Sequence, residues 1–369
     1  MSQRTDFIDR LRVVLTALVI VHHTAITYGG SGGWFYREVT DGSTASSLLL
    51  TLLCAVNQAF FMGLFFLIAG YFTPTSLARK GARHFLQDRL WRLGLPLLAF
   101  GFVLGPLTQA LADAAKGSDV LDAWLGALLQ GHFVIGPLWF ALALLIFALG
   151  HVGWRLLRPE PVGPTRPVPG HARWLAAALA VGAAALAIRQ FVPVGVNVLG
   201  LQLGYFASYV FLFALGCTAW RHRWLERVER AQALPWGCVG LAVLPTLFVA
   251  AALAGGLSGR PVNFNGGGSL PAVVYAFWEP FIAWGVIAML LWQFRVRFNR
   301  ASARWQGWAD RAYGAFIVHA PVIVALSVAG RGWDAPPLLK FAVVSVAGTV
   351  LSFAVAGALR RIPGARRVI

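Results

Sequence analysis

Two ionisable residues near the N-terminus, Arg12 and His23, lie eleven positions apart in one apolar stretch. In a helix, eleven residues of about 100° each return His23 to within ~20° of the face of Arg12, ~16 Å further along. This spacing predicts a cation at one mouth of a membrane span and an imidazole beyond its midplane. Ionisable groups at that depth are costly and usually functional. An imidazole is suited to taking a proton from a hydroxyl near neutral pH.

A carboxylate and two amides are expected at the same depth as His23. Glu279 follows Pro271, where an apolar run begins, so it lies ~12 Å from the opposite face of the membrane. His23 lies ~18 Å from its own face of a ~30 Å slab, which is the same level. We therefore expect Glu279 to orient His23, and Asn57 or Gln58 to hydrogen-bond a developing oxyanion.

Four further residues are candidates for ligand contacts. Arg89 and Arg92 lie three positions apart on one helical face and suit a phosphate-bearing ligand, or are ordinary cytoplasmic charge. His319 is expected only ~10 Å from the inner face, below His23, where it would pack or line a ligand channel. Trp139 begins an apolar run and is a candidate for substrate contact or for an interfacial aromatic belt.

Each central candidate also has a purely structural interpretation. His23 can be held by a neighbouring helix, Arg12 can pair with Asp9 three positions away, and Glu279 can form a structural pair with an arginine.

The composition defines the elements that must position these residues. The 369-residue chain is 58% hydrophobic and 12% charged, whereas soluble domains carry about 25% charged residues. We therefore predict an all-α polytopic membrane protein, with residues 1–369 forming a single integral-membrane domain. About ten apolar runs are long enough to span, at 11–29, 48–73, 93–112, 135–154, 174–192, 199–220, 235–256, 271–294, 312–330 and 338–359.

The distribution of charge predicts the topology. Of the 31 Lys and Arg residues, 25 lie in one alternating set of connectors and four in the other, so both termini are expected in the cytoplasm. Because the net charge of +17 is spread over these short connectors, nucleic acid is not expected as a partner. No Gly-x-Ser-x-Gly elbow, Walker loop or zinc-type spacing occurs, so neither a serine nucleophile of that type nor a metal is predicted.

Five motifs occur in order along the chain, namely the Arg12–His23 spacing, Phe65–Phe72, Arg89-Leu90-Trp91-Arg92, Leu138-Trp139-Phe140 and Tyr313–His319. Together they resemble the membrane acyltransferase-3 family, which includes bacterial O-acetyltransferases of surface glycans and glucan succinyltransferases. One departure is Ala69, where many members carry Ser, so position 69 is not expected to be a nucleophile.

The resemblance implies a multi-pass enzyme of the bacterial inner membrane. It would move an acyl group, acetyl in the first place, from cytoplasmic acyl-CoA to a hydroxyl of an extracytoplasmic glycan, glycolipid or other acceptor. His23 would be the general base, Arg89 and Arg92 would bind the CoA phosphates with Arg12, and His319 would line the path of the CoA arm. The alternative from another class is a proton-coupled small-molecule transporter, which buried polar residues also suit.

Overall fold

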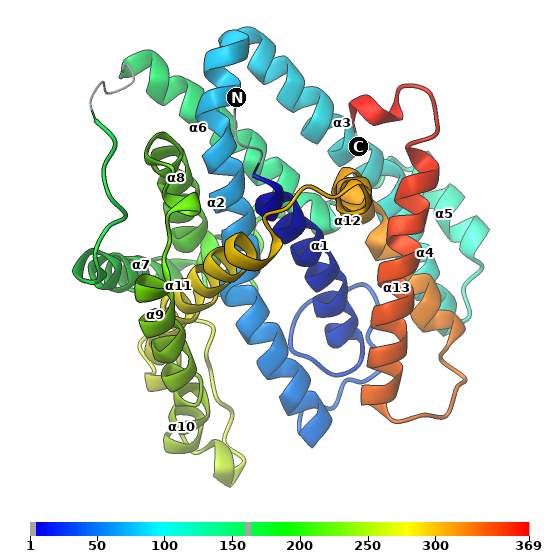
Figure 1. Ribbon diagram of the computed structural model, residues 1–369. Helices are drawn as coiled ribbons and strands as arrows, with labels where there is room; N and C mark the ends of the chain where they lie inside the picture. The colour runs from blue at the N-terminus through cyan, green and yellow to red at the C-terminus, as the bar shows by residue number, and fades with distance from the viewer. Residues whose placement is uncertain (1–4, 159–163, 369) are drawn as a thin grey trace. The chain divides into compact units, whose positions relative to one another are not determined.

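A computed structural model describes residues 5–158 and 164–368, and within them every regular element is a helix (Figure 1). Nine helical segments of these residues are long and apolar enough to cross a membrane, which confirms the all-α class. The second segment, Ala45–Lys116, contains two of the predicted spans, 48–73 and 93–112. It leaves helical geometry at Gly81, where φ is 70° and ψ is 163°. The nine segments thus account for all ten predicted apolar runs.

The helix boundaries differ from the apolar runs mainly where polar residues continue a helix. The predicted span 312–330 belongs to a helix that begins nine residues earlier, and a short apolar helix over 120–129 was not predicted. The α-helices in the described part of the chain are α1 (Asp6–Thr27), α2 (Ala45–Arg89), α3 (Leu95–Ala99), α4 (Gly105–Asp113), α5 (Val120–Leu129), α6 (Trp139–Leu157), α7 (His171–Phe191), α8 (Phe206–His222), α9 (Arg230–Val243), α10 (Thr246–Leu253), α11 (Leu270–Phe298), α12 (Ala303–Ala329) and α13 (Pro337–Leu359).

The described residues form two compact units, each assembled from separate stretches of the chain. The His23 unit comprises Asp9–Asn57, Ala82–Gly150 and 301–368. The Glu279 unit comprises the described parts of 1–8, 58–81 and 151–300. Of the nine predicted site residues, seven fall in the His23 unit, whereas Glu279 and Gln58 belong to the other.

In the His23 unit, α1 packs against α12 and α13. Near the start of α1, Val13 meets an alanine-rich face of α12 and the residues Phe353 and Ala356 of α13. Small residues at a helix contact let backbones approach closely, which is how membrane helices gain packing energy without a hydrophobic driving force. Further along α1, Ile20 packs with Ile323 and Val344. Helix α12 is therefore held along most of its length, and it also packs against α4.

In the Glu279 unit, α11 packs against α9 and α7, and α2 crosses α8 at two glycines. A Cβ atom added to Gly70 would lie 2.2 Å from the carbonyl oxygen of Phe213. One added to Gly216 would lie 2.2 Å from the carbonyl oxygen of Leu67. No side chain fits there, so the backbones themselves are in contact.

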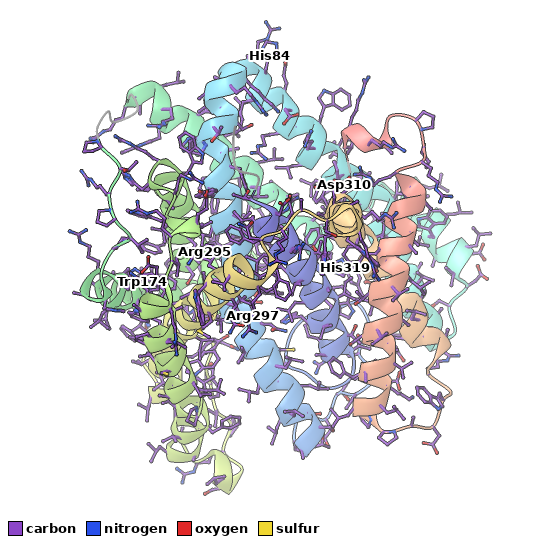
Figure 2. The ribbon with its side chains drawn as sticks, in the orientation of Figure 1. His84, Trp174, Arg295, Arg297, Asp310 and His319 are labelled. Atoms are coloured by element: carbon purple, nitrogen blue, oxygen red, sulfur yellow. The ribbon has the colours of Figure 1, made fainter. Side chains whose placement is uncertain are left out.

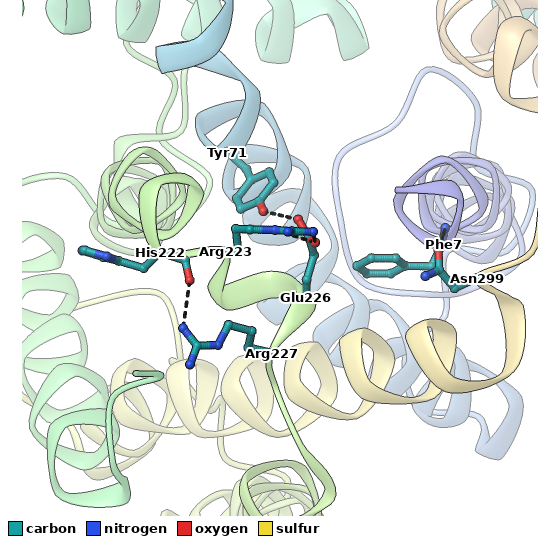
Figure 3. A network of polar contacts seen from close by, with 7 residues as sticks. All are labelled: Phe7, Tyr71, His222, Arg223, Glu226, Arg227 and Asn299. Atoms are coloured by element: carbon teal, nitrogen blue, oxygen red, sulfur yellow. Dashed lines mark hydrogen bonds and ion pairs between the residues drawn. The ribbon is translucent and has the colours of Figure 1, made fainter. Parts of the chain in front are cut away.

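The residue after Gly70 is fixed by a polar contact beyond the crossing. The Tyr71 hydroxyl donates a 2.7 Å hydrogen bond to the Glu226 carboxylate, which also pairs with Arg223 (Figure 3). In the same close-up, the backbone N–H of Phe7 donates to the side-chain oxygen of Asn299. The Gly-Tyr pair in the family-like stretch 65–72 thus has a structural role, which is to join α2 to α8 and to the turn after it.

Gly70→Ala should destabilise the protein, because the new methyl group would overlap the Phe213 carbonyl and force the helices apart. Overpacking of this kind costs about 1–3 kcal/mol. The matched control is Gly150→Ala on α6, where no atom lies within 4 Å of the added Cβ and the change should be neutral or slightly stabilising. Melting temperatures of the purified proteins in detergent test this, and equal values for the two variants would contradict it.

Candidate active site

His23 of α1 and His319 of α12 form a hydrogen-bonded pair, with 3.0 Å between Nδ1 of His23 and Nε2 of His319. His319 is fully buried, and Figure 2 labels it on α12. The predicted difference in depth between the two histidines is wrong. Because α12 begins at Ala303, His319 lies ~24 Å from the start of its helix, and His23 lies ~26 Å from the start of α1. Polar residues 303–311 extend the helix, so apolarity alone placed His319 too close to the inner face.

The hydrogen bonds of the pair determine where its protons lie. The other ring nitrogen of His319, Nδ1, is 2.5 Å from the carbonyl oxygen of Phe316, which can only accept. In a neutral His319, Nδ1 therefore carries the hydrogen and Nε2 accepts from the N–H at Nδ1 of His23. With Nδ1 protonated, a neutral His23 has its lone pair on Nε2. His23 is also partly exposed, so this nitrogen is poised to accept a proton from a ligand.

An indole ring covers one face of this pair. Trp34, from the segment after α1, stacks on His23 with 3.9 Å between ring centroids and 15° between planes. The same indole is 5.9 Å from the His319 ring. His22 meets His23 edge-on at 5.3 Å and is buried on a different face of α1. Stacking on Trp34 and the hydrogen bond to His319 thus hold the orientation of the His23 ring.

The predicted cations stand apart from the histidine pair, near the start of α1 and at the end of α2. Arg12 is partly exposed and pairs with Asp9 at 3.5 Å, the structural contact considered for it above. Arg92 pairs with Asp88 at 3.3 Å, and the Arg89 guanidinium lies 5.0 Å from the centre of the Phe85 ring. The chain continues directly into two π-helical turns, Leu90–Gly94 and Phe100–Leu104. Such turns occur frequently at functional sites.

Glu279 forms a buried ion pair with Arg189 of α7. The two side chains are 6% and 1% exposed. Arg189 Nε also donates to the carbonyl oxygen of Gly204 at 2.9 Å, and the rings of Tyr205 and Tyr275 flank its guanidinium at 5.4 and 5.1 Å. A buried carboxylate and guanidinium satisfy each other's charge, so this pair has the form of the structural alternative considered for Glu279.

The described hydrogen-bond partner of His23 Nδ1 is His319, and the orienting role of Glu279 stays a prediction. The nitrogen of His23 that an orienting carboxylate would bind, Nδ1, is already bonded to His319. The predicted equal depth of His23 and Glu279 stays a prediction, because the two residues lie in different units.

The remaining candidates have distinct surroundings. Gln58 donates from Nε2 to the Tyr209 hydroxyl at 2.8 Å within the Glu279 unit. Asn57 is buried in the His23 unit, and its Nδ2 has no hydrogen-bond partner among the residues described. Trp139 begins α6 and precedes Phe140, which packs edge-on against Phe316, the residue whose carbonyl binds His319. Among the predicted amides, Asn57 is the one with a free donor in the His23 unit.

The sequence interpretation missed three features for different reasons. Arg189 and Lys340 were the two cations that fell in neither set of connectors, and both prove to be buried in ion pairs. A cation inside an apolar run needs a buried partner, so the positions of these two residues could have been used to predict the ion pairs. Trp34 carried no such signal, since a tryptophan in a connector usually indicates only the membrane interface.

In residues 5–158 and 164–368, no group of three or more His, Cys, Asp and Glu side chains is arranged to hold a metal ion.

Comparison with known proteins identifies the family. A model of the Acyl_transf_3 family, described as an acyltransferase domain, matches residues 5–359. The chain belongs to this acyltransferase-3 family. A glucans biosynthesis protein C of Salmonella typhi is 28% identical over 235 residues, covering 60% of this chain and 59% of that protein. The protein of the same name from Escherichia coli K12 is 30% identical over 151 residues, covering 39% and 37%.

The chain therefore matches about three fifths or less of the length of these relatives. No solved structure is similar to this acyltransferase-3 chain. Membership of the family favours the enzyme over the transporter considered from the sequence.

Proposed function

We propose that this protein is a membrane-embedded O-acyltransferase that moves an acyl group from cytoplasmic acyl-CoA to a hydroxyl of an extracytoplasmic acceptor. The observation that carries the proposal is the His23–His319 pair, in which His319 binds Nδ1 of the partly exposed His23 and the neutral His23 keeps its lone pair on Nε2. Family membership over residues 5–359 supports acyl transfer as the reaction it serves.

In the proposed reaction, Nε2 of His23 removes the proton of the acceptor hydroxyl. The acceptor oxygen attacks the thioester carbonyl carbon, and the C–S bond breaks as the ester C–O bond forms. The imidazolium then returns the proton to the leaving thiolate, giving an ester and free CoA. The hydrogen bond from His23 Nδ1 to His319 strengthens when His23 becomes cationic, which stabilises the transition state in the manner of a triad.

The donor is proposed to enter from the end of the His23 unit that carries the cations. Arg12 precedes His23 by eleven residues on α1, so the two side chains share one helix face ~16 Å apart. The proposed phosphate contact and the proposed base therefore lie along the same face. CoA has its phosphates and its thioester at opposite ends of a long flexible arm. Arg89 and Arg92 would exchange their present contacts with Phe85 and Asp88 for those phosphates.

The acceptor is proposed to be a glucan or a related glycan. The support is the name of the relatives, which are glucans biosynthesis proteins. Acetyl is the first choice for the transferred group and succinyl the second, because the residues described in the His23 unit place no cation against the histidine pair.

The proposal is tested with purified protein, acetyl-CoA or succinyl-CoA labelled in the acyl group, and glucose disaccharides of each linkage as acceptors. Label should appear in the saccharide, and free CoA at 100 times its Kd should stabilise the protein by about 2.7 kcal/mol. Label in co-purified lipid would reassign the acceptor. Absence of transfer from both donors, together with no stabilisation by CoA, would overturn the proposal. Labelled protein accumulating without acceptor would show a covalent acyl-histidine step instead of direct transfer.

His319→Ala should lower the transfer rate about 100-fold with an unchanged KM for acyl-CoA, because His23 would lose the group that fixes its tautomer. His319→Gln should recover most of that loss, since its amide can donate to the Phe316 carbonyl and accept from His23. Steady-state kinetics of the two variants make the measurement. Equal losses in both, accompanied by lower melting temperatures, would indicate that His319 serves only packing.

A further inference from the structure

The segment between α1 and α2, residues 28–44, folds back over His23 instead of extending away from it. Its residue Trp34 lies flat on the His23 ring and beside His319. Trp34 also packs on the cluster formed by Ile20, Ile26 and their neighbours on α12 and α13. The segment is therefore a wall of the site, built into the core of the His23 unit.

A buried ion pair anchors this wall. Glu38 binds Lys340 of α13 at 2.6 Å, with side chains that are 17% and 8% exposed. The backbone N–H of Glu38 donates to the carbonyl oxygen of Thr27 at 2.8 Å, and the Ser47 hydroxyl donates to the carbonyl oxygen of Asp41 at 2.7 Å. These contacts hold both ends of the segment, which keeps Trp34 in place without an acceptor bound.

Glycine is required at position 29, where the segment 28–44 leaves the end of α1. Gly29 has a φ of 123°, and a Cβ there would lie 2.4 Å from the Ser47 hydroxyl oxygen. Beside it, burial raises the pKa of Tyr28 to about 12, so this phenol stays neutral at physiological pH.

The indole of Trp34 has an unused hydrogen-bond donor. Its Nε1 is buried, yet no residue in the described part of the chain accepts from it. An indole N–H is a donor only, and buried donors nearly always have a partner. The amide nitrogen of Asn57, in the same unit, is a second buried donor without one. A wall that carries an unpartnered donor beside the proposed base is complementary to a ligand that offers an oxygen acceptor.

We propose that Trp34 positions the acceptor, its N–H donating to a sugar hydroxyl oxygen adjacent to the hydroxyl that His23 deprotonates. This inference rests on the proposed acyltransferase function. The acceptor is favoured over the donor because Trp34 follows the end of α1, whereas Arg12, proposed to meet the CoA phosphates, lies near its start. A sugar presents neighbouring hydroxyls a few ångströms apart, so one can meet the imidazole while the next meets the indole.

The test compares Trp34→Phe, which keeps an aromatic ring over His23 but removes the donor, with Trp333→Phe. Trp333 is an exposed tryptophan in the connector between α12 and α13 and serves as the matched control. Acceptor and donor KM values and kcat are measured with acetyl-CoA and the glucose disaccharide that wild-type protein uses best. Trp34→Phe should raise the acceptor KM about tenfold, the size expected for one lost hydrogen bond to a buried donor. Its donor KM should stay within twofold of wild type.

An unchanged acceptor KM in Trp34→Phe, or an equal rise in the donor KM, would overturn the positioning role while leaving the acyltransferase itself intact. If wild-type protein transferred no acyl group to any acceptor and CoA did not stabilise it, the proposed acyltransferase function itself would fail. Trp34→Ala guards against an uninformative result, because it should add a loss of kcat as His23 loses its stacking partner. A Trp34→Ala protein with wild-type kcat and acceptor KM would also contradict the inference.

Discussion

His23→Gln protein should retain its affinity for the acyl donor but transfer the acyl group about a thousandfold more slowly. Positioned general bases contribute 10²–10⁴ in rate, and in this site the neutral His23 that donates from Nδ1 to His319 has its lone pair on Nε2. Glutamine is a neutral polar side chain that can still donate a hydrogen bond to His319, so the packing of α1 against α12 should be retained. The measurement is single-turnover transfer from labelled acetyl-CoA at saturating donor.

His22→Gln is the matched control for this prediction. It makes the same change one residue away on the same helix, at a histidine that is buried on another face and meets His23 edge-on. It should transfer within a few fold of wild type. Stabilisation by CoA, measured in all three proteins, shows whether each still folds around a donor site. A His23→Gln protein with more than a tenth of wild-type activity would remove the base from the mechanism.

Most of the fold follows from hydropathy, because the membrane forces long apolar runs to become helices with internally satisfied backbones. Nine described segments cover all ten predicted runs. The ends of the helices were harder to predict from hydropathy, because the stretch 303–311 continues α12 and contains no residue that ends a helix. Hydropathy marks where a helix is apolar, and capping or a break such as Gly81 decides where it ends.

The candidate site was predicted in part. The residue types of His23 and His319 were found, because ionisable groups inside apolar runs are conspicuous. Their contact was missed, since it depends on the true start of α12 and hence on the depth of His319. Trp34 illustrates a limit of a different kind. Its stacking on His23 is set by how the connector 28–44 folds, and no periodicity encodes that.

The two buried polar clusters differ in a way that bears on their roles. The His23–His319 pair is uncharged in the neutral tautomer derived above and leaves one nitrogen available to a ligand. The Arg189–Glu279 pair is charged, and its guanidinium is also bound to a backbone carbonyl and flanked by two tyrosines. One guanidinium nitrogen, Nη1, is buried without a hydrogen-bond partner among the described residues. A general base must keep a lone pair for its substrate, whereas a buried guanidinium and carboxylate neutralise each other's charge. We therefore propose a catalytic role for the first cluster and a structural role for the second.

Glu279→Gln should accordingly destabilise the protein by about 3–5 kcal/mol, because it leaves the Arg189 cation buried without its counter-charge. The exposed pair of Lys116 with Asp113 provides the control, since Asp113→Asn should cost less than about 1 kcal/mol. Unfolding midpoints in detergent compare the two variants.

The double variant Arg189→Met with Glu279→Met separates stability from catalysis. Replacing both partners of a buried pair by apolar groups is often neutral, so this protein should recover most of the stability lost in Glu279→Gln. If the pair is structural, the double variant should also transfer the acyl group within about tenfold of wild type. A double variant as stable as wild type but a hundredfold or more slower would instead return Glu279 to the catalytic group predicted from the sequence. Because the two outcomes differ in rate at equal stability, the experiment decides between an orienting carboxylate and a packing one.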